Sequence, residues 1–154
     1  MIIFQGHAYQ DIGFTPTGRW GNQGSGMLFT TGEKILLLER SASVEEPYTW
    51  GLPGGAVPQE GEDFKDVLES ARDEVVEELG QLPRHTVIDQ YVYQEESFRY
   101  TTYIARVDPS AEDLRFRMNW ENTDWLWVRQ DELDQLDLHF GVVDLLRHKD
   151  PFQS

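Results

Sequence analysis

Runs of apolar residues separated by turn residues predict strands in the first third of the chain. The runs over residues 27–31 and 34–40 are joined by a short link that contains glycine, which is typical of a β-hairpin. Residues 49–52 predict a third, short strand, and the Pro-Gly-Gly sequence that follows predicts that this strand ends in a loop. Residues 1–25 show no clear periodicity, so we expect an irregular N-terminal segment.

One amphipathic helix is predicted over residues 63–79. Apolar residues recur there at steps of three and four and form one stripe: Phe64, Leu68, Ala71, Val75 and Leu79. Gly80 stands where a glycine commonly ends a helix, and Pro83 prevents the helix from resuming. We therefore expect this helix to bury one face and to stop at Leu79.

The second half of the chain predicts further strands and a closing helix. Residues 86–93 and 98–107 are rich in β-branched and aromatic side chains and predict a second hairpin. The elements expected after it are strands over 114–119 and 125–129, an acidic turn over 131–137 and a helix over 141–147. No repeat or linker interrupts this order, so we expect a single α/β domain over residues 1–154.

Composition and charge narrow the classes of function. A chain of 154 residues with 39% hydrophobic and 12% aromatic residues suits one folded domain with a substantial core. Its 28 acidic residues against 13 Lys and Arg give a net charge of −15, which argues against nucleic-acid binding, because that requires clustered cations. The same charge repels an anionic small molecule unless a divalent cation screens the approach.

The side chains that commonly hold zinc are missing or scattered. The chain has no cysteine, which excludes disulfides and thiolate metal sites. The four histidines lack the short spacing of a metal site and are interpreted as surface or packing residues: His7, His85, His139 and His148. The N-terminus shows no secretory pattern, and no apolar run approaches the roughly 18 residues of a membrane span, so we expect a cytoplasmic protein without membrane contact.

Three glutamates of the predicted helix form the most informative pattern. Glu74, Glu77 and Glu78 lie at positions i, i+3 and i+4, within an arc of roughly 100° on one helix face. Like charges this close repel one another, and the negative end of the helix dipole adds to the repulsion. A hard divalent cation resolves it, since carboxylate oxygens suit magnesium or manganese. A solvated acidic face is the alternative interpretation.

The segment before this helix favours a site over a solvated face. Residues 50–62 combine the end of a short strand with Pro53, Gly54 and Gly55. Glycine lets the backbone approach a ligand closely, so carbonyl and amide groups there can contact a metal ion or a phosphate.

Loop and helix together resemble the motif of the Nudix hydrolase family, G-x5-E-x7-R-E-U-x-E-E-x-G-U, in which U is a bulky apolar residue. The residues that match are Gly55, Glu62, Glu74, Val75, Glu77, Glu78 and Gly80. The flanking sequences also resemble the family: residues 27–40 before the motif, the Trp-Gly-Leu-Pro-Gly-Gly sequence that leads into it, and the acidic loop and Trp-containing strand over residues 120–127.

The match departs from the motif at several positions. Six residues separate Gly55 from Glu62 where the motif has five, and ten separate Glu62 from the arginine position where it has seven. Asp73 occupies that arginine position and Gln81 the final apolar position. In the family the arginine orients the carboxylates, so either the neighbouring Arg72 replaces it or Asp73 is simply exposed to solvent. Glu69 is a rival to Glu62 for the supporting carboxylate.

The resemblance implies an α/β/α sandwich with a mixed β-sheet between helices. It implies Mg²⁺-dependent hydrolysis of the pyrophosphate bond in a nucleoside diphosphate-linked substrate, of the nucleoside triphosphate or nucleotide sugar class, with Mn²⁺ as the other candidate ion. The implied metal ligands are Glu74, Glu77, Glu78, Gly55 and Glu121. The implied catalytic residues are Glu74, Glu121 and Glu77, with Glu74 and Glu121 competing for the role of general base. The alternative is a catalytically weak or inactive nucleotide-binding module.

Candidates for contacting the substrate come from the arginines and aromatic residues near these elements. Arg40 and Arg99 suit phosphate contacts, and Phe98 and Trp120 suit stacking on a base. The competing interpretation is surface charge for the arginines and core packing for the aromatics. We expect a small nucleotide as the partner, without nucleic acid or membrane, and the family resemblance is compatible with a homodimer.

Overall fold

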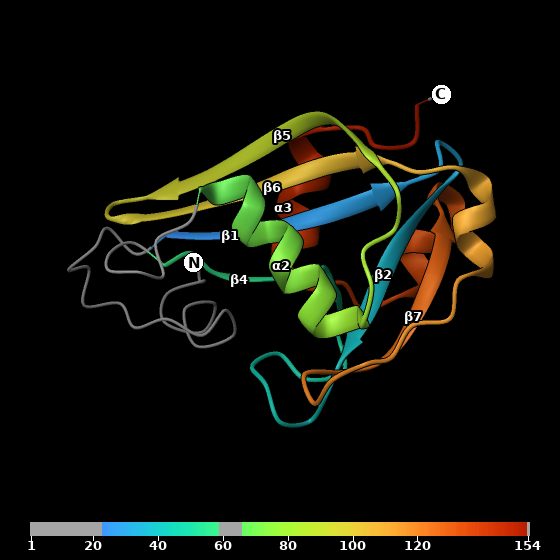
Figure 1. The fold of residues 1–154 in the computed structure, drawn as a ribbon, viewed down its shortest axis with the longest axis horizontal. Coiled ribbons are helices and arrows are strands. Elements are labelled where there is room, and N and C mark those ends of the chain that lie inside the picture. Colours follow the sequence, from blue (N-terminus) through green and yellow to red (C-terminus); the bar gives the residue numbers. More distant parts are fainter. Residues whose placement is uncertain (1–22, 59–65, 154) are drawn as a thin grey trace.

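The computed structural model describes residues 23–58 and 66–153 and shows one mixed β-sheet with a helix on each face (Figure 1). The elements in chain order are β1 (Gln23–Thr30), β2 (Lys34–Arg40), β3 (Trp50–Gly51), β4 (Gly54–Ala56), α2 (Val67–Leu79), β5 (Thr86–Glu95), β6 (Phe98–Arg106), the 3₁₀ helix η2 (Pro109–Asp113), β7 (Asn122–Arg129), the 3₁₀ helix η3 (Gln130–Gln135) and α3 (Phe140–His148). The predicted fold class, a mixed sheet between helices, is confirmed. Within the described ranges, no helix has the length and apolar character required to span a membrane.

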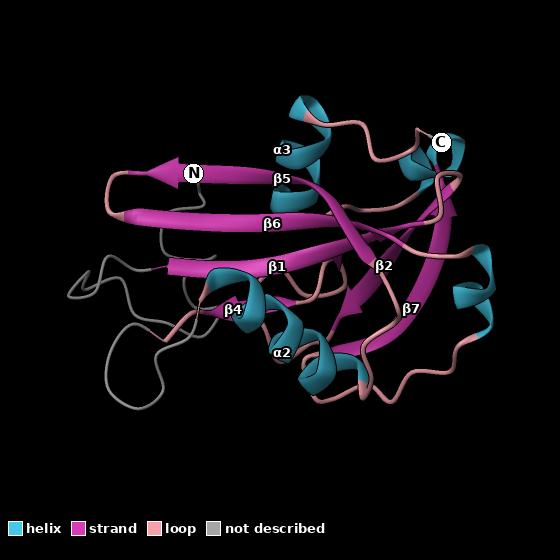
Figure 2. Cartoon of the chain, turned by 45° about the horizontal axis from the view of Figure 1, so that its top comes forward, coloured by secondary structure: helices cyan, strands magenta, loops and turns pink. Residues whose placement is uncertain are grey.

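The sheet has two parts, which are joined where β1 and β2 pair next to their connecting turn. Its strand order is β3-β2-β1-β6-β5. β4 lies beside β1, and β7 lies beside β2 (Figure 2). β1 runs parallel to β6 along its whole length, whereas it pairs with β2 at Thr30 and Ile35, next to their connecting turn. Farther from that turn, β1 takes β4 as its neighbour and β2 takes β3. The two strands therefore splay apart, and the glycine segment fills the space between them.

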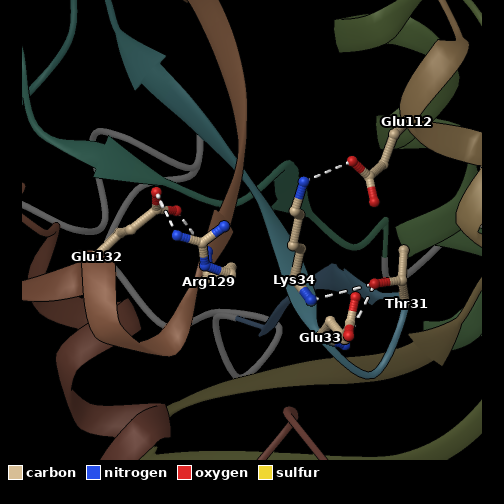
Figure 3. Close-up of polar contacts among 6 residues, drawn as sticks. All are labelled: Thr31, Glu33, Lys34, Glu112, Arg129 and Glu132. Carbon is tan, nitrogen blue, oxygen red and sulfur yellow. Dashed lines mark hydrogen bonds and ion pairs between the residues drawn. The ribbon is translucent and has the colours of Figure 1, made fainter.

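The turn that joins β1 to β2 is stabilised locally (Figure 3). The Thr31 side-chain oxygen accepts hydrogen bonds from the backbone N–H groups of Glu33 and Lys34, at 3.3 and 3.1 Å. Gly32 adopts a φ of 100°, a conformation that favours glycine. The ammonium group of Lys34 pairs with Glu112 of η2 at 2.9 Å, which ties this end of the sheet to the segment after β6.

Both faces of the sheet are buried at β1 and β2, which explains the continuous apolar runs of these two strands. Leu36 and Leu38 point into the cluster beneath α2, whereas Ile35 and Leu37 point into the cluster beneath α3. The predicted helical stripe is confirmed for Ala71, Val75 and Leu79, which are fully buried in the first cluster. Leu68 is partly buried, and Phe64 lies outside the described residues.

The described helix α2 begins later than residue 63 and ends where predicted. The Asp66 side chain accepts a hydrogen bond from the Glu69 backbone at 2.8 Å and caps the N-terminus. Gly80 closes the C-terminus with a φ of 80°, in the left-handed region, and its N–H donates to the Val76 carbonyl.

Both predicted hairpins, the late strand and the closing helix are confirmed. The prediction of a strand over residues 114–119 is wrong, because this segment makes no strand pairing. Its alternating pattern reflects packing: Phe116 is buried against Trp125, with ring centroids 5.3 Å apart. The segment predicted as a loop after Pro53 instead contains β4. The acidic turn is largely the helix η3, and the irregular segment expected over residues 1–25 falls almost entirely outside the described residues.

Candidate active site

Glycines occupy the centre of the site, where the backbones of β1 and β4 and the side chain of Tyr100 approach one another closely. Gly26 of β1 stands opposite Gly54 of β4. A Cβ atom placed on Gly54 would lie 2.0 Å from the Tyr100 hydroxyl and 2.6 Å from the Ser25 carbonyl oxygen. One on Gly26 would lie 2.5 Å from the carbonyl oxygen of Pro53. Side chains are therefore excluded here, which explains why the Pro-Gly-Gly sequence forms a strand.

Glu78 is the buried carboxylate of the site, and two donors hold it. The Gly54 backbone N–H donates to one oxygen at 3.0 Å, and the Asn122 side-chain amide donates to the other at 2.9 Å. Only 4% of the residue is exposed. Burial raises the pKa of Glu78 well above its ordinary value, the charges of Glu121 and Glu74 raise it further, and the two hydrogen bonds partly oppose this shift.

Glu74 lies against the other glycine. A Cβ atom on Gly55 would lie 2.5 Å from the Glu74 carboxyl group, so this carboxylate rests directly on the glycine backbone. Glu77 is exposed on the same helix. α2 therefore directs Glu74 and Glu78 toward β4 and leaves Glu77 facing solvent.

Glu121 reaches the same place from the end of the late loop. Its backbone carbonyl accepts a hydrogen bond from the Ser41 N–H at 2.9 Å, which fixes the loop beside the end of β2. Its side chain accepts a hydrogen bond from the Asn119 amide at 3.1 Å. Glu121 and Glu78 both line the cavity described below. Among residues 23–58 and 66–153, no group of three or more His, Asp or Glu side chains is close enough to form a ready metal cage.

The arginine position of the motif is altered in the structure as well as in the sequence. Arg72 donates from Nε to Nε2 of His85 at 3.1 Å, and His85 Nδ1 lies 2.8 Å from the Pro83 carbonyl oxygen. Arg72 is thus directed toward the segment after α2, while Asp73 is exposed. Of the two alternatives, the exposed aspartate agrees with the structure. Glu69 is exposed too, and Glu62 lies outside the described residues.

A largely apolar cavity extends from Glu78 along the face of β5 and β6 to α3. It is lined by residues from separate parts of the chain: Arg40, Val44, Leu52, Gly54, Glu78, Tyr91, Tyr93, Phe98, Tyr100, Thr102, Glu121, Asn122, His139, Phe140, Gly141, Val142 and Asp144. Of the residues predicted to contact substrate, Arg40 and Phe98 line it. Arg99 is exposed on β6, and Trp120, with 67% of its surface exposed, projects from the late loop; neither lines the cavity.

Several cavity residues were absent from the sequence predictions. Tyr91 and Tyr93 share one face of β5 and stand opposite Thr102 and Tyr100 of β6. Their two-residue spacing in the predicted hairpin was the available signal. Nothing in the sequence, however, placed α3 above that face.

His139 shows how the cavity rim is held. Its Nδ1 accepts a hydrogen bond from the Gly141 N–H at 3.0 Å and so caps α3, and its Nε2 lies 3.3 Å from the Glu46 carboxylate. A ring that accepts at Nδ1 carries its proton on Nε2, so it can donate to Glu46 while neutral. The Arg40 guanidinium donates from Nε to the Glu45 carbonyl at 2.8 Å. These contacts tie the loop after β2 to the start of α3.

Comparison with known proteins agrees with this arrangement. The NUDIX domain family matches residues 23–148, and the chain belongs to this family of hydrolases. Nudix hydrolases cleave the pyrophosphate bond of nucleoside diphosphate-linked compounds, and this chain shares that general class of activity. No curated protein matches the chain.

Solved structures share the fold at low sequence identity. The Nudix hydrolase RenU from M. smegmatis is 24% identical with a TM-score of 0.65, covering 82% of this chain and 81% of RenU. The MutT Nudix hydrolase from Burkholderia pseudomallei is 23% identical with a TM-score of 0.61, covering 84% and 98% of the two chains. The NUDIX domain of Shewanella oneidensis NrtR, complexed with ADP ribose, is 14% identical with a TM-score of 0.63, covering 91% and 93%.

Proposed function

We propose that this protein catalyses Mg²⁺-dependent hydrolysis of the pyrophosphate bond in a nucleoside diphosphate-linked small molecule, of the nucleoside triphosphate or nucleotide sugar class. The observation that carries the proposal is the buried Glu78 carboxylate, held by Gly54 and Asn122 at one end of an aromatic cavity that Glu121 also lines. A nucleotide has an aromatic base and a polyanionic tail, and this cavity offers aromatic side chains together with the carboxylates of Glu78 and Glu121.

Carboxylate oxygens suit a divalent cation, although the side chains of the described residues would have to move closer together than they are in this structure to hold one. Glu78 is buried close enough to Glu74 and Glu121 for their charges to raise its pKa, which makes the ionised form costly without a counter-charge. The side chains that would hold the ion are Glu74, Glu78 and Glu121, with Glu77 and the Gly55 carbonyl as further oxygen donors. The ion would neutralise phosphate oxygens and promote ionisation of a water molecule.

The residues of the chain have separate tasks in this proposal. Glu121 and Glu74 remain the two candidates for accepting the proton of the attacking water. Glu78 is held in place by its two donors, and Arg40 at the cavity wall is suited to contact a phosphate oxygen. The ADP ribose bound by the NrtR domain supports a nucleotide ligand for a fold of this kind.

A second candidate function is a nucleotide-binding module with little or no turnover. The observation that favours it is the motif's altered arginine position, where Asp73 is exposed and Arg72 bonds to His85. Without an orienting arginine, the carboxylates could lie too loosely for efficient catalysis, since a misplacement of about 1 Å can cost about 100-fold in rate.

The test is product release from a panel of nucleoside triphosphates and nucleotide sugars in the presence of Mg²⁺. We expect Glu78→Gln to reduce kcat by about 100-fold or more, as removal of one group that stabilises the transition state typically does. Glu33→Gln, at an exposed position in the turn between β1 and β2, is the control and should leave the rate unchanged. Nucleotide binding by the wild type without product would instead establish the binding module.

A further inference from the structure

One wall of the cavity is aromatic. Tyr93 packs edge to face against Phe98 and Phe140, with ring centroids 6.1 and 6.2 Å apart, and Phe98 lies 6.3 Å from Tyr100. The rings contact one another and form one cluster, in which Phe98 is buried. Tyr93 and Phe140 stay partly exposed and line the cavity, so they can offer an apolar contact to a ligand.

One charged group stands in this wall. Asp144 lines the cavity. It belongs to α3, which lies on the face of the sheet opposite α2 (Figure 1). One of its carboxylate oxygens accepts a hydrogen bond from the Tyr91 hydroxyl at 2.5 Å. Burial and the neighbouring Asp144 raise the pKa of Tyr91, so the hydroxyl stays protonated and donates.

Asp144 is also held through His148. The His148 ring stacks on Tyr91 with centroids 5.1 Å apart and an interplanar angle of 16°, and its Nδ1 lies 2.9 Å from the Asp144 backbone carbonyl. The Asp144 side chain is therefore held by Tyr91, and the stacked His148 ring in turn holds Tyr91 in place. An ionised carboxylate has about four acceptor sites, so the bond to Tyr91 leaves acceptors for a ligand. The proposed hydrolysis uses none of these three residues.

The chemistry of the bases decides which ligand suits such an acceptor. A carboxylate accepts two parallel hydrogen bonds only from two neighbouring donors. Guanine presents them on one edge, as the ring N1–H and the exocyclic amino group. The amino groups of adenine and cytosine stand beside acceptor nitrogens, and the ring N–H of uracil lies between two carbonyls, so each places an acceptor against the carboxylate.

We infer that Asp144 is a specificity-determining residue that selects guanine as the base of the nucleotide, with the base on the aromatic wall and its N1–H and amino groups donating to the carboxylate. The inference rests on the proposed function in taking the cavity as the nucleotide site. It adds the identity of the base, which neither the family nor the glutamate motif specifies.

The test measures binding, because a nucleoside monophosphate has no pyrophosphate bond to cleave. GMP, IMP and AMP are titrated into the full chain by calorimetry. IMP keeps the ring N–H but lacks the amino group, and AMP lacks both donors. We expect wild type to bind GMP at least about tenfold more tightly than AMP, with IMP between them, the discrimination typical of a bidentate pair.

Variants separate recognition from folding. Asp144→Asn keeps the size and can still accept from Tyr91, and it should lose about tenfold in GMP affinity while AMP binding changes little. Tyr91→Phe keeps the Asp144 carboxylate but removes the hydrogen bond that holds it. We therefore expect a smaller loss of affinity, confined to GMP. Asp89→Asn is the matched control: Asp89 pairs with Lys149 just after α3 and does not line the cavity. It should bind all three nucleotides as wild type does.

Three outcomes would overturn the inference: equal affinity for GMP and AMP in the wild type, equal losses for both in Asp144→Asn, or absence of monophosphate binding. Tighter binding of choline than of GMP would also overturn it, in favour of an aromatic site for cations. Because binding of monophosphates requires no turnover, a guanine preference can persist if hydrolysis fails. Turnover without base preference would overturn only the role of Asp144.

Discussion

Three distant parts of the chain meet at Glu78. The environment of this residue explains why its charge destabilises the fold and why it suits the proposed site. The carboxylate comes from α2, its two donors come from β4 and β7, and its surroundings are buried and negatively charged. An ionised group in such a place destabilises the fold unless a cation is bound nearby. Burial of the Glu78 carboxylate therefore costs stability in the metal-free protein, and the proposed cation would offset this cost.

The buried Glu78 carboxylate predicts how the stability of the protein varies with pH. The pKa of Glu78 is raised in the folded state, so its stabilising contribution is complete below the ordinary pKa of 4.5 and is lost as pH rises through the raised value. In EDTA, we expect Glu78→Gln to unfold at higher urea concentration than wild type at neutral pH, and the difference to shrink toward pH 4.5. Millimolar Mg²⁺ should stabilise wild type more than the variant. A pH-independent difference would contradict this account.

The glycines of the site make a separate prediction about packing. Gly54→Ala places a methyl group 2.0 Å from the Tyr100 hydroxyl and 2.6 Å from a backbone oxygen. We expect a loss of about 1–3 kcal/mol in the free energy of unfolding, as for overpacked cores. Gly51→Ala is the control, since its nearest neighbour lies at 3.4 Å, an ordinary contact. Urea denaturation measures both, and equal losses would show that the close approach in β4 is not rigid.

At the scale of elements, local patterns predicted the hairpins and helices of the chain. Errors arose where the formation of a strand depended on a neighbouring strand with which the segment could pair. Residues 114–119 alternate like a strand but pack beside Trp125 without pairing. The reverse holds for Gly54–Ala56, whose composition disfavours a strand and which forms one because β1 offers glycines opposite. The periodicity of a sequence indicates which side chains are buried. The pairing of β-strands depends instead on which backbone segments can approach closely enough to form hydrogen bonds.

The start of α2 offers a test of an element boundary. Asp66 caps the helix that carries the site glutamates. Asp66→Ala should lower the free energy of unfolding by about 1 kcal/mol, because one backbone N–H loses its acceptor. Asp66→Asn retains the cap and should cost little. The comparison is made by urea unfolding followed by circular dichroism, and an equal loss in both variants would point to charge in place of capping.

At the scale of the whole molecule, the site divides into a half that the sequence indicates and a half that only the fold reveals. The glutamates of one helix and the nearby glycines lie close in sequence, so their spacing indicated them. The cavity joins Arg40, Tyr91, Tyr100 and Asp144 from separate elements, and its walls are set by how α3 crosses the sheet. Spacing along the chain carries no information about that crossing, so the sequence did not indicate that Tyr93 and Asp144 line the cavity.

The net charge of −15 belongs to the molecule as a whole and predicts an unusual dependence on salt. A polyanionic nucleotide approaches against this field, which is screened over about 10 Å at 0.1 M ionic strength. With Mg²⁺ held constant, kcat/KM for a nucleoside triphosphate should rise severalfold between about 0.02 and 0.2 M KCl, whereas an enzyme with a basic cleft would lose activity. Asp131→Asn combined with Asp134→Asn removes charge on η3 without touching the cavity and should flatten the rise. A fall in kcat/KM with salt would show that local cations, Arg40 and the bound metal, outweigh the field of the surface.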